Sequence, residues 1–309
     1  MDVVCPICNS NNTKQSAAYR GDHDCFKNMN LIYCQDCTLT FASPMPDMHE
    51  LREFNHEYFH SAHGGKAKDT ISKAFFSAIA RIRVATISKY LGAAEGRVKR
   101  VLEFGPGDGY LANIWQEKHP QTTYLALETD KSCHSKLQDM NITLIDEDEL
   151  DNLRNIDLII MSHVLEHVTD PGEFLLKAFK TLNVGGAIFI EVPCLDFLHK
   201  NLDEPHLLFF DKKSMEVLLE TTGFKTVYMG YYGNLINKLK CNSYFQNIFR
   251  RVRNKLISLG FVRLFLRDEP GLEIMQNDLE RVAIIPHKAH IESKEPAWWL
   301  RAIAKKPEL

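Results

Sequence analysis

Residues 101–110 read VLEFGPGDGY, an apolar run followed by glycines at positions 105, 107 and 109. The apolar run is typical of a buried strand, and the residues from 110 onward have the spacing of a helix. Glycine in the turn between them permits positive φ angles and lets a ligand lie against bare backbone. A strand, a glycine-rich turn and a helix therefore predict a ligand-binding loop in an α/β domain.

Two common phosphate-binding loops do not fit this turn. A nicotinamide-binding loop, Gly-x-Gly-x-x-Gly/Ala, needs a small residue at position 110, where Tyr110 stands. A P-loop needs Gly-Lys-Ser/Thr, which does not follow. Glu103, two residues before the first glycine, suits a ligand that carries an ammonium and a sulfonium better than it suits phosphate.

Strands and helices alternate on both sides of this loop. A helix is expected at 71–91, and two further strand-like runs occur at 281–285 and 298–304, one of which must complete the sheet. Alternation of this kind predicts an α/β fold with a doubly wound, Rossmann-like parallel sheet covered on both faces. The other expected strands are 98–104, 123–127, 142–145, 156–161, 187–192 and 225–229, and the other expected helices are 110–119, 131–140, 171–182 and 211–223.

Four of the eight cysteines form two Cys-x-x-Cys pairs near the N-terminus, Cys5 with Cys8 and Cys34 with Cys37. Two such turns complete a tetrahedral sulfur site of the kind that Zn²⁺ prefers, and the chain between them is too short to bury a core of its own. A redox-active dithiol is the alternative, but no βαβ pattern surrounds these pairs. We therefore expect a structural zinc ribbon, with Cys25 as an ordinary buried thiol.

The glycine loop resembles the first motif of class I S-adenosylmethionine-dependent methyltransferases, Glu/Asp-x-Gly-x-Gly-x-Gly, and further matches follow in order. Glu128 ends the second strand, where the family keeps an acid for both ribose hydroxyls. Asp146 and Glu147 follow the third strand, where an acid commonly meets the adenine amino group. Residues 156–168, IDLIIMSHVLEHV, look like the fourth-strand motif, and residues 182–186, LNVGG, like the loop before the fifth strand.

The resemblance implies a seven-stranded sheet and S-adenosylmethionine as the cofactor. The residues that it assigns to cofactor binding are Glu103, Gly105, Pro106, Gly107, Gly109, Glu128, Asp146, Glu147 and His163. An N-terminal ribbon before such a domain is further similar to a bacterial group of methyltransferases, many of which act on sugars or other small metabolites.

A general base is useful when the acceptor is a hydroxyl, and histidine has a suitable pKa. Candidates are His163, Glu166 and His167 after the fourth strand, and His206 before a late helix. In the family the first of these histidines often lines the cofactor, and a histidine before the late helix faces the acceptor. We predict His167 and His206 as the catalytic residues, with a backbone-capping role as the alternative for His167.

The chain is expected to divide into a zinc ribbon at 1–45, a connector with an amphipathic helix at 46–95, and a methyltransferase domain at 96–309 with a basic helical insertion at about 236–280. Residues 238–267 hold eight Lys/Arg and no Asp or Glu. We interpret them as a solvated helical insertion, with an anionic-ligand lid or a membrane-surface contact as alternatives. The histidines at 49, 56, 60 and 63 have no metal-ligand spacing and are interpreted as surface or cleft residues.

Composition narrows the class of function. With 37 Lys+Arg against 40 Asp+Glu, bulk nucleic-acid binding is disfavoured, and no window is apolar enough for a transmembrane segment. The first residues lack the regions of a signal peptide, so we expect a cytoplasmic protein. A nucleic-acid methyltransferase is also disfavoured, because Ser162-His163-Val164-Leu165 stands where such enzymes carry Asn/Asp-Pro-Pro-Tyr/Phe.

The sequence favours O-methylation of a small hydroxylated acceptor, such as a sugar or nucleotide sugar made for a surface polysaccharide. Sugar C-methylation is the variant, although ribbon-containing enzymes of that kind carry a larger C-terminal domain than this chain holds. An alternative from another class is an inactive scaffold that binds the cofactor and uses the ribbon and the basic helix for docking.

Overall fold

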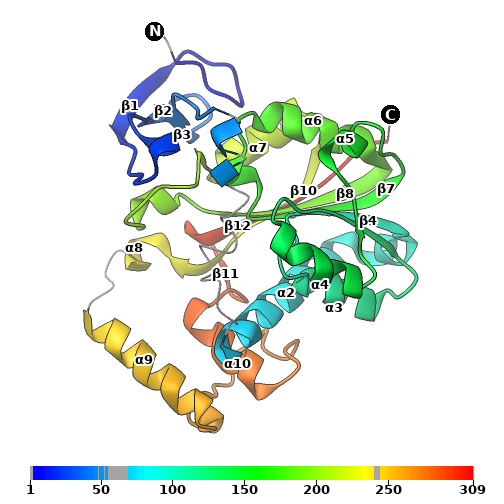
Figure 1. The fold of residues 1–309 in the computed structure, drawn as a ribbon, viewed down its shortest axis with the longest axis vertical. Helices are drawn as coiled ribbons and strands as arrows, with labels where there is room; N and C mark the ends of the chain where they lie inside the picture. The colour runs from blue at the N-terminus through cyan, green and yellow to red at the C-terminus, as the bar shows by residue number, and fades with distance from the viewer. Residues whose placement is uncertain (1–2, 48, 52, 55–68, 240–243, 309) are drawn as a thin grey trace.

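The structure is a computed structural model that describes residues 3–47, 49–51, 53–54, 69–239 and 244–308. Its centre is an eight-stranded sheet with the order β11-β10-β12-β8-β7-β4-β5-β6 (Figure 1). The strands are β4 (Arg100–Phe104), β5 (Thr123–Leu127), β6 (Thr143–Leu144), β7 (Ile156–Ser162), β8 (Leu182–Pro193), β10 (Lys225–Leu235), β11 (Glu292–Ser293) and β12 (Ala297–Lys305).

The predicted doubly wound sheet is confirmed, with one strand reversed. β4, β5, β6, β7 and β8 pair in parallel, whereas β12 lies antiparallel between β8 and β10. The chain leaves β10 and returns into β12 at the same end of the sheet, so no helical crossover is needed for this pair. The two-residue strand β11 adds an eighth strand at the edge.

Helices cover both faces of the sheet, as expected from the alternating pattern (Figure 1). On one face lie α2 (Thr70–Leu91), α3 (Tyr110–Lys118) and α4 (His134–Asp139), which contribute to one buried cluster. On the other face lie α5 (Glu147–Leu150), α6 (Pro171–Thr181) and α7 (Lys212–Thr221). The predicted start of the late helix is confirmed, because the Asp211 carboxylate accepts the Ser214 amide of α7 at 2.9 Å.

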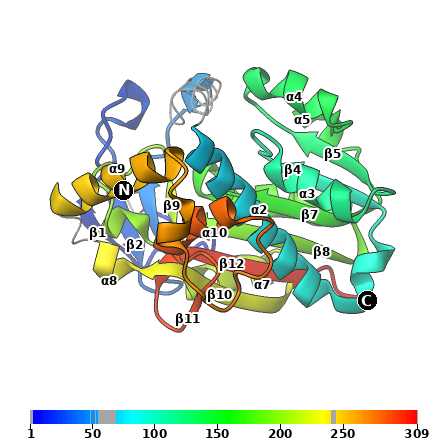
Figure 2. The same cartoon turned by 90° about the horizontal axis from the view of Figure 1, so that it is seen from below.

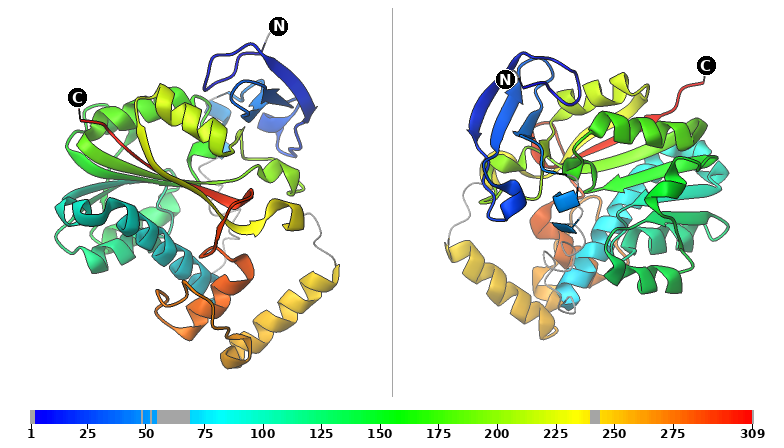
Figure 3. Two further views of the ribbon diagram at one scale, coloured as in Figure 1. Left: turned by 180° about the vertical axis from the view of Figure 1, so that it is seen from behind. Right: turned by 45° about the horizontal axis from the view of Figure 1, so that its top comes forward.

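The N-terminal ribbon shares a sheet with the rest of the chain. Its strands are β1 (Thr13–Ala18), β2 (Asn30–Cys34) and β3 (Thr40–Ser43), and β3 pairs with β9 (Leu208–Phe209). One buried cluster runs from Cys5 in the ribbon to Leu219 in α7 without interruption. Figure 3 shows the ribbon on the α7 side of the large sheet, so the two parts have a common core.

The described residues between β10 and β11 include several helices. They are α8 (Ile236–Leu239), α9 (Tyr244–Ser258), η6 (Val262–Phe265), α10 (Asp278–Ile284) and η7 (Ile285–His287). The predicted strand at 281–285 is therefore wrong. Asn277 caps α10 by accepting the Glu280 amide at 3.0 Å, and the Glu280 carboxylate binds Ser77 and Arg81 of α2. A short apolar run fits a buried helix as well as a strand, and packing on α2 decides between them (Figure 2).

The basic segment at 238–267 is largely the helix α9, which stands away from the sheet in Figure 1. It exposes apolar side chains as well as arginines, and Phe249 is 68% exposed. Among the helices that the structure describes, none combines the length and the apolar character of a membrane span. His56, His60, His63 and Cys241 lie outside the described residues.

Candidate active site

The glycine loop connects β4 to α3 at the carboxyl end of the sheet. Gly105, Gly107 and Gly109 have φ angles of 61°, 55° and 74°, a region that side chains rarely adopt. A Cβ atom on Gly105 would lie 2.9 Å from Val164, and one on Gly109 would lie 2.9 Å from Leu137. The bare backbone is thus needed both for the turn and for close packing against the loop after β7 and against α4.

The two predicted carboxylates lie next to this loop in different environments. Glu128 is half-buried, and its oxygens accept the Gly107 amide at 2.8 Å and the Asp130 amide at 2.9 Å. Glu103 is only 3% exposed, and Tyr124 donates its hydroxyl to it at 2.7 Å. Burial raises the pKa of Glu103 to about 7. Glu128 therefore holds the loop itself, whereas Glu103 lies beneath it.

The other predicted cofactor acids lie at the surface. Asp146 precedes α5, and its amide donates to Glu149 at 2.8 Å, while Glu147 begins the helix. Both side chains are exposed beyond the end of β6, at the same edge of the sheet as the glycine loop. The structure therefore keeps these two residues on the predicted side of the sheet without burying them.

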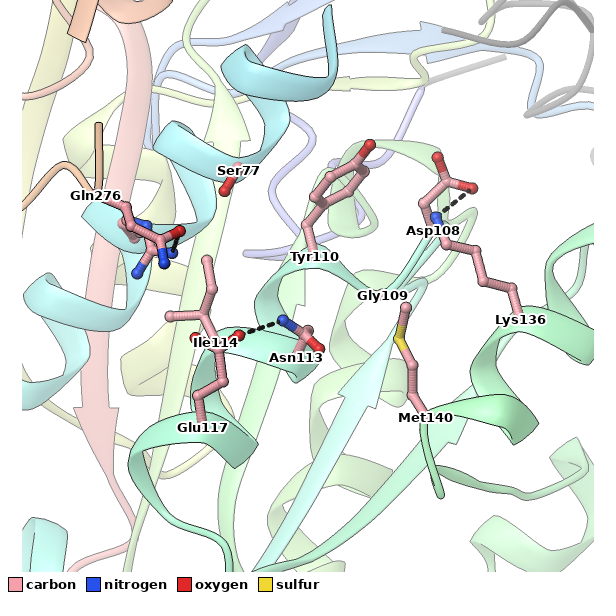
Figure 4. Close-up of a pocket in the computed structure, with 11 residues that line it drawn as sticks. Ser77, Asp108, Gly109, Tyr110, Asn113, Ile114, Glu117, Lys136, Met140 and Gln276 are labelled. Carbon is pink, nitrogen blue, oxygen red and sulfur yellow. Dashed lines mark hydrogen bonds and ion pairs between the residues drawn. The ribbon is translucent and has the colours of Figure 1, made fainter. Parts of the chain in front are cut away.

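A cavity of about 310 Å³ lies behind the glycine loop, between α2, α3 and α4 (Figure 4). Asp108 and Lys136 form an ion pair at its rim, and Lys136 lies over the Tyr110 ring at 5.0 Å. Of the predicted cofactor residues only Gly109 lines this cavity. It is therefore separate from the histidines described next.

A histidine–aspartate pair lies on the loop between β8 and β9. His206 is buried, and its Nδ1 lies 2.7 Å from the carboxylate of Asp196. Lys200 contacts the same carboxylate at 2.6 Å. Burial opposes ionisation of Asp196, but His206 and Lys200 outweigh it and hold its pKa well below the usual range. This charged acceptor directs the Nδ1 proton of His206 toward Asp196 and leaves Nε2 for another partner.

His167 packs against His206 with 4.9 Å between the ring centres. Its Nδ1 lies 3.3 Å from the Pro205 carbonyl, and burial lowers its pKa to about 4, so the ring is neutral at pH 7. Glu166 lies beside both rings and is fully buried. Burial opposes ionisation of Glu166, but a contact of 3.3 Å with His163 keeps its pKa below the usual value.

A cluster of buried charged side chains lies beside His163. Glu191 of β8 binds Arg83 of α2 and Arg301 of β12, and it lies 3.5 Å from His163 Nε2. Burial disfavours the carboxylate, but Arg83 and Arg301 outweigh it and hold the pKa of Glu191 well below its usual range. Arg301 is fully buried and lies over the Tyr232 ring at 4.1 Å.

The ribbon holds the loop that carries His206. Tyr19 donates its hydroxyl to the His206 carbonyl at 2.9 Å, and the Arg20 amide donates to Asp203 at 2.7 Å. Glu204 accepts two further backbone amides of the ribbon. The position of His206 therefore depends on the folded ribbon.

The four predicted metal-binding cysteines come together. Their Sγ atoms all lie within 4.8 Å of one another, and the pairs Cys5–Cys37 and Cys8–Cys34 are each 3.5 Å apart. None of the four is in a disulfide. Tetrahedral Zn²⁺ at about 2.3 Å from each sulfur would place the sulfurs about 3.8 Å apart, so the donor set fits this ion.

Residues 76–228 match a family model that is described as a methyltransferase domain. The protein is a methyltransferase. Its doubly wound sheet, with the glycine loop after β4, is the fold that the resemblance to class I S-adenosylmethionine-dependent methyltransferases implies. Among curated proteins, no sequence match was found.

Solved methyltransferases have similar structures at low identity. One is a SAM dependent methyltransferase from Archaeoglobus fulgidus, which is 16% identical with a TM-score of 0.47, covering 73% of this chain and 92% of that chain. Another is magnesium protoporphyrin IX methyltransferase from Synechocystis PCC 6803 with bound SAH, which is 11% identical with a TM-score of 0.46, covering 60% and 92%.

Several site residues of this methyltransferase are not among those predicted from the sequence. Asp196 was missed because a single Asp in a loop carries no signal. Glu191 and Arg301 were missed although a usable signal existed, since each is a charged residue inside an otherwise apolar strand.

Proposed function

We propose that this methyltransferase methylates a hydroxyl oxygen of a small acceptor, such as a sugar or nucleotide sugar of surface polysaccharide biosynthesis. The observation that carries the proposal is the His206–Asp196 pair beside His167, on loops that follow β7 and β8. Ligands of open α/β sheets bind at the carboxyl ends of the strands, and a histidine oriented by a carboxylate suits proton removal from a hydroxyl. A cytoplasmic location is part of this proposal, and a nucleotide-sugar acceptor is compatible with it.

The cofactor site is proposed on the glycine loop. S-adenosylmethionine supplies a methyl group that its sulfonium already activates. The bare backbone at Gly105 and Gly107 lets the ligand approach, and Glu128 offers oxygens for the ribose hydroxyls. Glu103 is proposed to bind the ammonium, one of Asp146 and Glu147 to bind the adenine, and His163 to line the site.

The protein's own residues must align the acceptor oxygen with the methyl group and accept its proton. A methyl transfer of this kind needs alignment and exclusion of water more than strong acid–base help. Nε2 of His206, with Nδ1 fixed by Asp196, is proposed to accept the proton, and the neutral His167 ring faces the same space.

Glu128→Ala is expected to weaken binding of S-adenosylhomocysteine by about 10-fold to 100-fold. The substitution leaves two loop amides without their acceptor and removes a partner of the ribose hydroxyls, a loss of about 1–3 kcal/mol. Isothermal titration calorimetry measures the affinity. Glu117→Ala, at the cavity of Figure 4, is the matched control and should keep the wild-type value; wild-type affinity in Glu128→Ala would contradict the assignment.

His206→Ala and Asp196→Asn are each expected to lower kcat by about 10²-fold, with cofactor affinity unchanged. Asp196→Asn removes the charged acceptor that fixes the His206 tautomer. The readout is transfer of labelled methyl from S-adenosylmethionine to a panel of sugar nucleotides. His119→Ala, whose ring contacts Glu95, serves as the control. Unchanged kcat in both site variants would remove the base assignment.

The same assay separates the alternatives. Nuclear magnetic resonance of the product distinguishes an O-methyl from a C-methyl group. Cofactor binding without transfer to any acceptor would favour the scaffold interpretation. We further infer that the four cysteines hold a structural Zn²⁺, which leaves no open coordination position for catalysis.

A further inference from the structure

Glu166 is a buried carboxylate without the hydrogen bonds that such a group needs. It is 0% exposed, and neither carboxylate oxygen has a hydrogen-bond donor among the residues that the structure describes. The contact with His163 Nδ1, at 3.3 Å, does not meet the geometry of a hydrogen bond. His163 offsets part of the carboxylate charge, but two buried oxygens without a hydrogen bond still favour a further donor or a cation.

Two histidine rings lie beside this carboxylate, and Nδ1 of each ring faces an oxygen of the protein. His206 Nδ1 is held by Asp196 at 2.7 Å, and His167 Nδ1 by the Pro205 carbonyl at 3.3 Å. A histidine ring that carries its only proton on Nδ1 presents Nε2 as an acceptor. His167 Nε2 lies 3.9 Å from Glu166 Oε1, which is too far for one proton to bridge them.

One ring nitrogen of each histidine and one Glu166 oxygen lie within 4.8 Å of one another. A cation placed between three such ligand atoms would offset the charge of the carboxylate. We propose that Glu166, His167 and His206 together bind a divalent cation of the first transition row.

The donor set indicates which cation. Two imidazole nitrogens and one carboxylate oxygen suit Zn²⁺, Mn²⁺ or Fe²⁺, and three protein ligands leave positions open for a substrate. Asp196 and the Pro205 carbonyl are the outer partners that fix the ring orientations, as metal-bound histidines require. The thiolates of the ribbon, by contrast, are poor ligands for Mn²⁺. Manganese therefore distinguishes the two sites.

The use of this cation in catalysis rests on the proposed function. An acceptor hydroxyl in an open position would have a lower pKa and would release its proton to water. Its oxygen would then bond to the methyl carbon while the bond between that carbon and the cofactor sulfur breaks. With the cation bound, His167 and His206 are ligands, so water replaces His206 as the proton acceptor of the proposed function. Asp196 then acts on the reaction through His206.

The test is a Mn²⁺ titration of the full chain carrying zinc in its ribbon, with free Mn²⁺ followed by electron paramagnetic resonance and total metal by mass spectrometry. Wild type is expected to hold two divalent cations, one in the ribbon and one at Glu166. Glu166→Gln is expected to hold one and to bind Mn²⁺ at least about 100-fold more weakly. Glu173→Gln, an exposed residue of α6, is the control and should match wild type.

A thermal melt and the zinc content show whether Glu166→Gln is folded, and His167→Gln is the second variant if it is not. One cation in the wild type, or equal Mn²⁺ binding in all variants, would overturn the site. Methyl transfer to a hydroxyl without a second cation would leave the proposed function intact and refute the cation. A second bound cation without any methyl transfer would leave the cation site intact and refute the proposed function.

Discussion

Cys34→Ser is expected to abolish zinc binding and to lower the melting temperature of the whole methyltransferase by roughly 10 °C or more. Cys34 is fully buried, with its Sγ 3.5 Å from Cys8 Sγ. The ribbon is too small to fold on its own core, so the proposed Zn²⁺ would supply much of its folding free energy. Because β3 pairs with β9 and the two parts share one core, loss of the ribbon exposes apolar surface of the catalytic domain.

The same substitution should reduce methyl transfer as well as stability. The loop that carries His206 is bonded to Tyr19 and Arg20 of the ribbon. Zinc content by mass spectrometry, a thermal melt and the methyl-transfer assay measure the three effects. Cys25→Ser is the matched control, since Cys25 lies outside the group of four and contacts His23 at 3.2 Å. A zinc-free Cys34→Ser protein that melts like wild type would contradict the structural role.

The local parts of the fold could be predicted because each follows from short-range physics. Alternating glycines permit the positive φ angles of the turn, and the two Cys-x-x-Cys turns bring four thiols together. Asp211 marks a helix start through a side-chain acceptor that lies three residues from its donor. These patterns depend only on residues that are close in the sequence, so they can be recognised without knowing the tertiary contacts.

The parts that could not be predicted depend on residues far apart in the chain. The pairing of β3 with β9 joins residues near 40 to residues near 208. The two-residue strand β9 has no sequence pattern that predicts this pairing. The helix α10 is stabilised by contacts between Glu280 and α2. The Asp196–His206 pair likewise arises from the path of one loop, although His206 itself was predicted as a site residue.

Glu191→Gln is expected to lower the free energy of unfolding by about 3–5 kcal/mol. The carboxylate is fully buried and is the counterion of both Arg83 and Arg301, so its removal leaves two guanidinium groups facing a neutral amide. Chemical denaturation measures the loss. His163 also loses its partner at 3.5 Å, so cofactor affinity should fall with stability.

A double-mutant cycle with Arg301→Met separates the ion pair from simple loss of packing. Arg301→Met alone leaves Glu191 with one buried partner, whereas the double variant removes both charges of the pair together. Since an uncompensated buried charge costs more than an absent pair, the double variant should be less destabilised than the sum of the single ones, by about 1–3 kcal/mol. If the losses in the free energy of unfolding are additive, Glu191 and Arg301 stabilise the protein through packing and not through their charges. The charge of this pair would then not contribute to the position of His163.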